Sequence, residues 1–410
     1  MRFIEETWSS EKLGNLCKIT MGQSPSSKNY SKNSNDTILI QGNADLISGK
    51  IVPRIYTSEI TKLSYPGDII LTVRAPVGDL AINEFDSCIG RGVCSIKGNK
   101  FIYYYLESLK DKHVWERLSQ GSTFKSVNSN DIKNLNLKIP SNSTQNHIIN
   151  FFTAIDTKIE LLQKKHGEYI RFKQYLMQNI FADKSAEKLR FDDNCQYKTK
   201  QVKDFLIESK IEGIDDINKR LTVKLNLNGI TVRESKTIEI EGATKQFIRK
   251  TGQFIYGKQN LHKGAFGIIP KELDGYLTSS DIPSFDFKEG IEPKWFYYYF
   301  ARKSFYEKLE NLSTGTGSKR ISPKEFLNIK IIVPEFKEQH KIVCLLEKFD
   351  EKINGISNQI VQMNMFKKSL LQQMFVVRIN WRCNFKLAKS PSFNKHLLIL
   401  KNKIIFIIIK

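Results

Sequence analysis

The sequence has few of the features that mark an exported or membrane-bound chain. Its six cysteines (positions 17, 88, 94, 195, 344 and 383) include no CxxC pair, so neither a disulfide framework nor a zinc site is expected. We expect instead a cytoplasmic protein whose thiols are reduced. The longest apolar run, residues 404–409, is far shorter than the roughly 20 residues of a membrane-spanning helix. The amino terminus has no basic segment followed by an apolar one, and so does not predict a secretory signal.

Motifs of catalysis are also missing. The sequence has no GxGxxG or GxxxxGK[ST] for nucleotides, no [DN]PP[YFW] for amino-methyl transfer and no HExxH for zinc, and its six histidines show no ligand spacing. We therefore expect a non-catalytic chain that holds neither a metal nor a cofactor.

What the sequence does contain is a long internal repeat. Residues 100–181 recur without a gap at 294–375, with 21 identities in 82 positions, whereas chance would give about five. An offset of 194 residues is too long for a solenoid, whose units run about 20 to 50 residues. The chain is therefore two tandem copies of a domain-sized unit.

Positive charge is in excess, with 64 Lys and Arg against 43 Asp and Glu. Residues 376–410 hold eight of the cations and no acid, which still leaves +13 of the formal +21 on the first 375 residues. Such an excess favours a polyanionic partner, because cationic side chains release counterions condensed on nucleic acid. A generally basic proteome or simple solubility would account for the same balance.

Each copy ends in a predicted long helix with an apolar seam at alternating spacings of four and three, the pattern of a coiled coil. The seam positions are Ile148, Phe152, Ile155, Ile159 and Leu162 in the first helix, and Ile342, Leu346, Phe349, Ile353 and Ile356 in the second. Lys173 and Lys367 occupy equivalent places further along. They either set how the helices pair or are lysines at an exposed end of the seam.

An apolar strand that ends in proline precedes each helix, at Pro140 and Pro334. Ser143 and Thr144 are expected to cap the first helix, and Glu335 and Glu338 to favour the start of the second. The copies diverge before these points, where short apolar runs predict mixed strands and helices. The expected domains are 1–143, a helix over 144–182, a connector at 183–196, a second domain over 197–337 and a helix over 338–375. Residues 376–410 form a basic and apolar tail outside the fold.

Two divergent α+β domains, each followed by a closely repeated coiled-coil helix, resemble the specificity (S) subunit of type I restriction-modification enzymes. The resemblance lies in GSTFKSVNSNDIKNLNLKIPSNSTQNHIINFFTAID (121–156) and GTGSKRISPKEFLNIKIIVPEFKEQHKIVCLLEKFD (315–350), each a Gly-rich turn, strand, proline, glutamine and helix. The first copy departs from the family pattern with Thr144-Gln145 where the second has Glu338-Gln339, and residues 376–410 extend beyond the usual end.

The resemblance implies a fold and a set of partners. Each divergent domain would be a target recognition domain that reads one half of a bipartite, asymmetric site in double-stranded DNA, and the two helices would pair antiparallel and separate the halves. Methyltransferase (M) subunits, two of them, and endonuclease/translocase (R) subunits would dock on this chain. S-adenosylmethionine, ATP and Mg²⁺ would belong to those partners, whose complex would methylate adenine N6 and cleave DNA with ATP.

Candidate DNA contacts are basic residues in loops or just after predicted strands. They are Arg74, Arg91 and Lys125 in the first copy, and Arg233, Lys258, Lys319 and Arg320 in the second. Lys125 and Lys319 are identical at the repeat offset and lie in Gly-Ser-Thr loops, whose backbone N–H groups suit phosphate. Ordinary surface charge is the alternative for each of them, and a contact with the methyltransferase is another for the two lysines.

Two other functions remain open at this point. One is a coiled-coil protein-interaction module, which would retain no DNA by sequence. The other is an unrecognised DNA-modifying enzyme, which would turn over without partner subunits.

Overall fold

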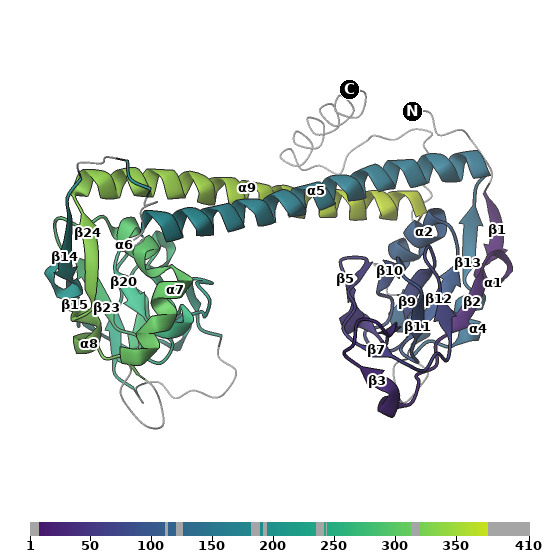
Figure 1. The fold of residues 1–410 in the computed structure, drawn as a ribbon, viewed down its shortest axis with the longest axis horizontal. Helices are drawn as coiled ribbons and strands as arrows, with labels where there is room; N and C mark the ends of the chain where they lie inside the picture. Colours follow the sequence, from purple (N-terminus) through teal and green to yellow (C-terminus); the bar gives the residue numbers. More distant parts are fainter. Residues whose placement is uncertain are drawn as a thin grey trace. The chain divides into compact units, whose positions relative to one another are not determined.

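The computed structural model describes residues 8–110, 114–119, 126–181, 189–191, 195–234, 242, 244–312 and 320–375. The chain divides into two compact units, one of residues 1–159 with 361–410 and the other of residues 160–360 (Figure 1). Lys125, Lys319 and the tail at 376–410 lie outside the described residues. None of the described helices is long and apolar enough to cross a membrane.

The first unit is built on two mixed sheets. The larger has the strand order β2 (Lys18–Met21), β12 (Val93–Lys97), β9 (Ile69–Thr72), β10 (Leu80–Ile82), β6 (Lys50–Ile51) and β5 (Leu46–Ile47). The smaller has the order β3 (Tyr30–Ser31), β7 (Tyr56–Thr57), β4 (Thr37–Ile40), β11 (Ser87–Ile89) and β8 (Leu63–Ser64). A separate antiparallel pair joins β1 (Ser9–Lys12) to β13 (Asn136–Ile139). The pairings β10–β6 and β11–β4 are parallel, and the others are antiparallel.

Strand β9 shows why its run of apolar residues is needed. Ile69 and Leu71 belong to the core that contains α2 (Lys100–Lys110), while Ile70, between them, packs in the cluster shared with the smaller sheet. Successive side chains of a strand point to opposite faces, so a strand covered on both sides is apolar throughout. The remaining short helices of this unit are α1 (Leu13–Leu16), α3 (Val114–Leu118) and α4 (Ser129–Lys133), with 3-10 turns η1 (Ser27–Asn29) and η2 (Asn43–Asp45).

The second unit has smaller, antiparallel sheets (Figure 1). Its main sheet has the order β15 (Leu206–Ser209), β23 (Ser284–Phe287), β20 (Phe254–Tyr256) and β21 (Phe266–Ile268). The others are β16 (Glu212–Gly213), β19 (Gln246–Ile248) and β22 (Leu277–Ser279), then β17 (Leu221–Val223) with β18 (Ile230–Val232), and β14 (Tyr197–Gln201) with β24 (Lys330–Pro334). Its short helices are α6 (Pro293–Phe300), α7 (Lys303–Tyr306) and α8 (Pro323–Leu327). Its 3-10 turns are η3 (Val202–Asp204), η4 (Ile217–Lys219), η5 (Leu261–Lys263), η6 (Lys271–Leu273) and η7 (Glu307–Leu312).

The two long helices are α5 (Asn142–Ile180) and α9 (Phe336–Phe375), and they pack together antiparallel. In the first unit, Lys367 of α9 meets Asp156 of α5, and Phe375, later in α9, meets Phe152, earlier in α5. Along the seam, the five expected residues of α5 are buried, as are Ile342, Leu346 and Ile356 of α9, while Phe349 and Ile353 are half-buried. The predicted α+β fold with paired long helices is confirmed.

A repeated glutamine attaches the start of each long helix to the preceding strand. Gln145 Nε2 donates to the carbonyl of Pro140 at 3.1 Å, and Gln339 Nε2 donates to that of Pro334 at 3.0 Å. The predicted cap of the first helix was wrong by two residues, because α5 begins at Asn142 and the hydroxyl that accepts from the Thr144 amide, at 3.4 Å, is that of Ser141. The helix therefore begins two residues after Pro140, the proline that follows the strand, and not at Ser143 or Thr144 as the sequence predicted.

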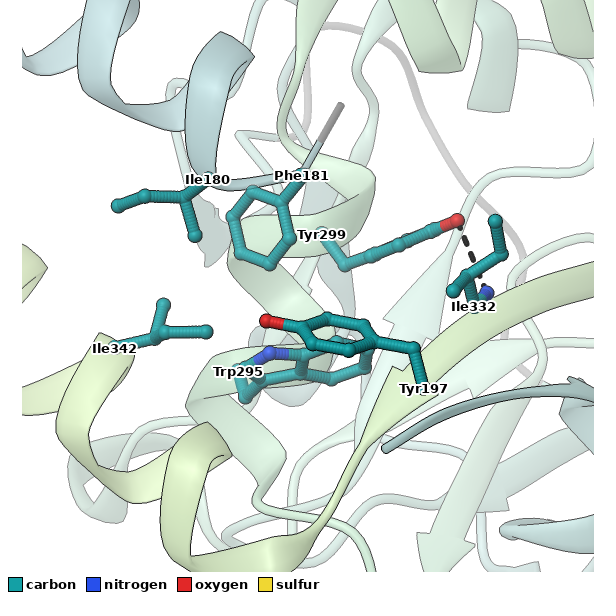
Figure 2. A pocket seen from close by; sticks show the side chains of 7 residues that line it. All are labelled: Ile180, Phe181, Tyr197, Trp295, Tyr299, Ile332 and Ile342. Atoms are coloured by element: carbon teal, nitrogen blue, oxygen red, sulfur yellow. Dashed lines mark hydrogen bonds between the residues drawn. The ribbon is translucent and has the colours of Figure 1, made fainter. Parts of the chain in front are cut away.

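Each long helix ends in a phenylalanine that completes the core of the domain from the other sequence copy. Phe181, which ends the first repeat, packs in the second unit against Trp295 and Tyr299, at ring distances of 5.8 and 5.5 Å (Figure 2). The gap beside them is about 10 Å³, room for one water at most. The repeated tyrosines near these rings are core residues: Tyr103–Tyr105, Tyr298 and Tyr299 are buried, and Tyr297 is half-buried.

Phe375, which ends the second repeat, makes the equivalent contacts in the first unit. Its ring lies 5.5 Å from Phe101 and 5.0 Å from Tyr105, the residues that the 194-residue offset matches to Trp295 and Tyr299. The structural unit is therefore not the sequence repeat. Each unit contains the first part of the long helix of its own sequence copy and the last part of the long helix of the other copy.

The seam lysines are held by partly buried ion pairs, and their own side chains are only 11% (Lys367) and 16% (Lys173) exposed. Lys367 Nζ lies 2.8 Å from both Asp156 Oδ1 and Glu107 Oε2, and 5.3 Å from the ring centre of Tyr104, whose hydroxyl donates to Asp156. Burial by itself lowers the pKa of Lys367, but the carboxylates of Glu107 and Asp156 outweigh it and raise the pKa above the ordinary lysine value.

The second unit repeats this contact at an offset of 194 residues. Lys173 pairs with Asp350 and lies 4.8 Å from the ring centre of Tyr298, whose hydroxyl donates to Asp350 at 2.6 Å. Ala301 stands where the first unit has Glu107, so this lysine has one carboxylate partner at that place instead of two. Each contact joins three elements, namely both long helices and either α2 or α6.

Replacing the terminal phenylalanines should loosen the unit that each completes. We expect Phe375→Ala to cost about 3–5 kcal/mol through the cavity it leaves and to speed amide exchange in residues 8–159. The matched variant Phe181→Ala should speed exchange in the second unit instead. Hydrogen exchange read by mass spectrometry checks both, and exchange that rose in the domain of the same sequence copy would contradict this packing.

Replacing Lys367 should cost more stability than replacing Lys173. Lys367→Met leaves two partly buried carboxylates without their cation, Glu107 and Asp156, 29% and 32% exposed, at about 1–3 kcal/mol. Lys173→Met leaves only one, Asp350, which is 38% exposed. Because the pKa of Lys367 is raised in the folded state, its contribution is fully present below the ordinary value of 10.5 and is lost as the pH rises beyond it. Urea unfolding at pH 7 and above pH 10.5 would measure both effects, and equal losses in the two variants would contradict the prediction.

Candidate nucleic-acid interface

Arg74 and Arg91, predicted separately, line one hollow of the first unit, with a volume of about 540 Å³. Arg74 follows β9 and Arg91 lies in the turn between β11 and β12. Two further segments complete the lining: the loop before β3 and the start of β3 contribute Ser24 and Tyr30, and the stretch from the end of β4 into η2 contributes Gln41 and Asn43. The structure therefore brings together residues from four separate parts of the chain.

Close backbone packing forms the base of this hollow. A Cβ on Gly92 would lie 2.0 Å from the carbonyl oxygen of Gln41, and one on Gly22 would lie 2.1 Å from that of Gly90. Glycine is needed where two backbones approach this closely. The amide of Arg91, between the two glycines of its turn, donates to Ser24 Oγ at 3.1 Å, so the turn that carries Arg91 is fixed from both sides.

The hollow is positive and uncompensated. The side chains of Arg74 and Arg91 are exposed and form no hydrogen bond or ion pair within the described part of the chain, and no carboxylate lines the hollow. The nearest buried acid, Asp45, faces the loop, where Oδ2 accepts from the amides of Gln41 and Gly42, and it pairs with Arg54 at 3.5 Å. Two guanidinium groups are thus available to an anionic or hydrogen-bonding partner.

The second unit joins Lys258 and Arg320 at the equivalent place. The amide of Ile321 donates to the carbonyl of Lys258 at 2.9 Å, as the amide of Val127 does to Val73 in the first unit. Here, however, Arg320 pairs with Asp281 at 3.1 Å. The second unit therefore has a basic site at this position whose charge is partly neutralised.

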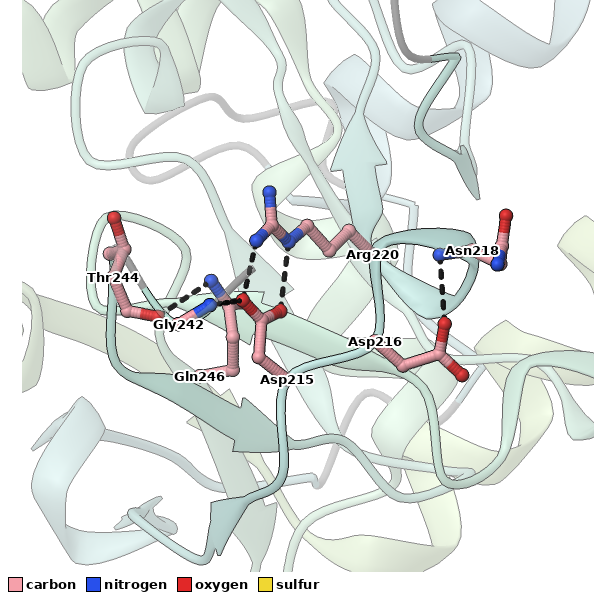
Figure 3. Close-up of polar contacts among 7 residues, drawn as sticks. All are labelled: Asp215, Asp216, Asn218, Arg220, Gly242, Thr244 and Gln246. Carbon is pink, nitrogen blue, oxygen red and sulfur yellow. Dashed lines mark hydrogen bonds and ion pairs between the residues drawn. The ribbon is translucent and has the colours of Figure 1, made fainter. Parts of the chain in front are cut away.

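Arg233 lies elsewhere in the second unit, next to a buried ion pair. Its amide donates to the carbonyl of Arg220. The guanidinium of Arg220 donates two hydrogen bonds to Asp215, one of them 2.9 Å long (Figure 3). The amide of Gly242 also donates to Asp215, at 2.8 Å. The Arg220 guanidinium, followed by the amide of Gly242, lowers the pKa of Asp215. This pair holds the loops around β17 and β18 and is not available to a ligand.

The structure adds residues to the site that the sequence did not indicate. Gln41, Asn43 and Tyr30 were missed, because uncharged residues in irregular loops have no periodicity that would reveal them. Lys125 and Lys319 lie outside the described residues, although Ser126, which follows Lys125, pairs with Arg74 in an isolated bridge. Within the described ranges no group of His, Cys, Asp or Glu could hold a metal ion.

A family model identifies both domains. The type I restriction modification DNA specificity domain matches residues 5–168 and again 196–363, most of the chain. The chain belongs to this family. Each match covers one sheet-containing domain and the greater part of the long helix that follows it.

Individual relatives of this specificity-domain chain support the same family assignment. A Methanocaldococcus jannaschii protein named as the type I restriction enzyme MjaX specificity subunit is 36% identical over 191 residues, 44% of this chain and 44% of that protein. The MjaIX specificity subunit of the same organism is 22% identical over 75% of this chain and 76% of its own length. The chain thus matches less than half the length of the first of these relatives.

A solved structure shares the fold of this specificity-domain chain. The type I restriction-modification S subunit of M. genitalium has a TM-score of 0.56 and 15% identity, and the match covers 92% of this chain and 98% of that one. A DNA-specificity subunit of such a system is itself non-catalytic, in line with the lack of catalytic motifs.

Removing the charge of Asp215 should loosen the loops around β17 and β18. Asp215→Asn at pH 7 loses the ion pair with Arg220, and we expect faster amide exchange at Gly242. Asp216→Asn is the matched control, since asparagine caps a helical turn as well as aspartate does. Because the pKa of Asp215 is lowered, the pair's contribution is present above the ordinary value of 3.8 and is lost as the pH falls below it. Equal exchange in both variants at pH 7 would contradict this role.

Proposed function

We propose that this chain reads a bipartite DNA site for a type I restriction-modification complex, with one half-site read by each unit. The observation that carries the proposal is the hollow with two unpaired guanidinium groups, Arg74 and Arg91, on one of two DNA specificity domains. Exposed arginines without acidic neighbours attract the phosphate backbone and can hydrogen-bond base edges. Because the two domains diverge in sequence outside the repeat, the two half-sites should differ.

The helices supply the second part of the proposal. α5 and α9 are 39 and 40 residues long, about 60 Å each at 1.5 Å per residue. Half-sites one turn of duplex apart are separated by about 34 Å. A seam of buried apolar residues, with a lysine–aspartate pair in each unit, keeps the helices in one register. We assign them the role of setting the length of the unread spacer.

Partners perform the chemistry in this proposal. Methyltransferase subunits would bring S-adenosylmethionine, and endonuclease subunits would bring ATP and Mg²⁺. Since residues 100–181 recur at 294–375, two copies of one methyltransferase subunit would find two similar surfaces, which supports a pair of them. A cytoplasmic location follows from the proposed DNA substrate.

Exchanging one domain should change one half of the site. Replacing residues 1–143 by those of a relative with a known motif is expected to alter one half of the methylated sequence and to leave the other half and the spacer unchanged, since the helices are retained. Replacing residues 197–337 is the matched experiment for the other half. Methylome sequencing of the host reads both results, and an exchange that altered both halves together would refute reading by separate domains.

A further inference from the structure

The hollow's polar side chains include two kinds that can read bases, guanidinium groups and amides. Arg74 and Arg91 present guanidinium groups, and Gln41 and Asn43 present amides. None of the four side chains is hydrogen-bonded to another residue in the described ranges. A guanidinium group makes two hydrogen bonds to the O6 and N7 atoms of guanine, and an amide makes two to the N6 and N7 atoms of adenine.

A surface that only binds phosphate would not need this combination. Phosphate contacts rely on charge and on backbone amides, and tolerate flexible lysines. The hollow instead lacks lysine, and its polar groups stand on turns fixed by backbone packing. Asp45 holds the amides of Gln41 and Gly42 from behind, and Gly90, Gly92 and Ser24 fix the turn of Arg91. Such preorganisation favours geometric recognition over simple attraction.

We propose that this hollow is the base-reading surface of the first unit, where Arg74 and Arg91 read guanine and Gln41 and Asn43 read adenine in the major groove. The inference rests on the proposed function and adds the chemistry of its specificity. The half-site read by residues 8–143 then contains at least one guanine whose identity depends on Arg91. At the equivalent place in the second unit, Arg320 is held by Asp281, so that unit must read its half-site with another set of residues.

Replacing Arg91 by lysine separates base reading from phosphate binding. Arg91→Lys keeps the positive charge but loses the planar pair of donors. We expect the assembled complex to bind its methylated motif about 10- to 100-fold more weakly. Its affinity for a duplex with the critical G·C pair changed should stay the same, so that discrimination at that pair disappears. Arg117→Lys, at an exposed arginine of α3 in the same unit and outside the hollow's lining, is the control and should retain full discrimination.

The measurements are binding of the complex to the methylated motif and to duplexes changed at one base pair each, at several salt concentrations. Gln41→Ala and Asn43→Ala should remove discrimination at an A·T pair of the same half-site. If Arg91→Lys binds every duplex as the wild type does, and Arg91→Ala weakens all of them alike and shallows the salt dependence by about one charge, Arg91 contacts phosphate and the inference is overturned. The same holds if discrimination is lost in the half-site read by residues 197–337. A wild-type complex with no sequence preference would instead overturn the proposed function itself.

Discussion

Burial of the helix ends is the interaction on which the rest of this structure depends. Phe181 and Phe375 lie among aromatic rings that belong, in each case, to the domain of the other sequence copy. A large aromatic side chain in a well-packed site contributes several kcal/mol, comparable with the whole stability of a small domain. Neither domain can therefore be complete until the far end of the partner copy's helix has folded against it. The two domains and the helix pair are therefore expected to fold cooperatively.

The polar contacts along the seam add specificity to this apolar packing. An ion pair buried between helices contributes little net stability, since desolvation offsets much of its attraction, but an unpaired charge in the same place is costly. Lys367 and Lys173 meet their aspartates only when the helices are antiparallel and in register, and the tyrosines that join them extend this requirement to α2 and α6. A slip by one turn would leave a lysine and an aspartate in each unit without partners.

The candidate interface follows a different physical rule. Its arginines are exposed and form no ion pair within the described residues, and the structure fixes the backbone of the turns that carry them. Glycines 22, 90 and 92 let chain segments approach within van der Waals distance, and Asp45 holds the neighbouring loop by its amides. A rigid base with exposed recognition groups suits reading of a partner surface, because little conformational entropy remains to be lost on binding. The second unit places Lys258 and Arg320 at the same point but keeps an acid beside them, which agrees with the divergence of the two domains.

The sequence by itself determined the features that depend on local pattern. The gapless repeat, the long helices, their seam and the strand that ends in proline all follow from spacing and identity along the chain, and the resemblance built on them named the family. Only the tertiary structure decided that Phe181 and Phe375 cross to the other copy's domain, that Ser141 caps α5, and that Glu107 adds a second carboxylate beside Lys367 where the second copy has Ala301. The hollow likewise joins four separate parts of the chain. Such contacts form between segments that are far apart in sequence, and the periodicity of a single segment does not predict them.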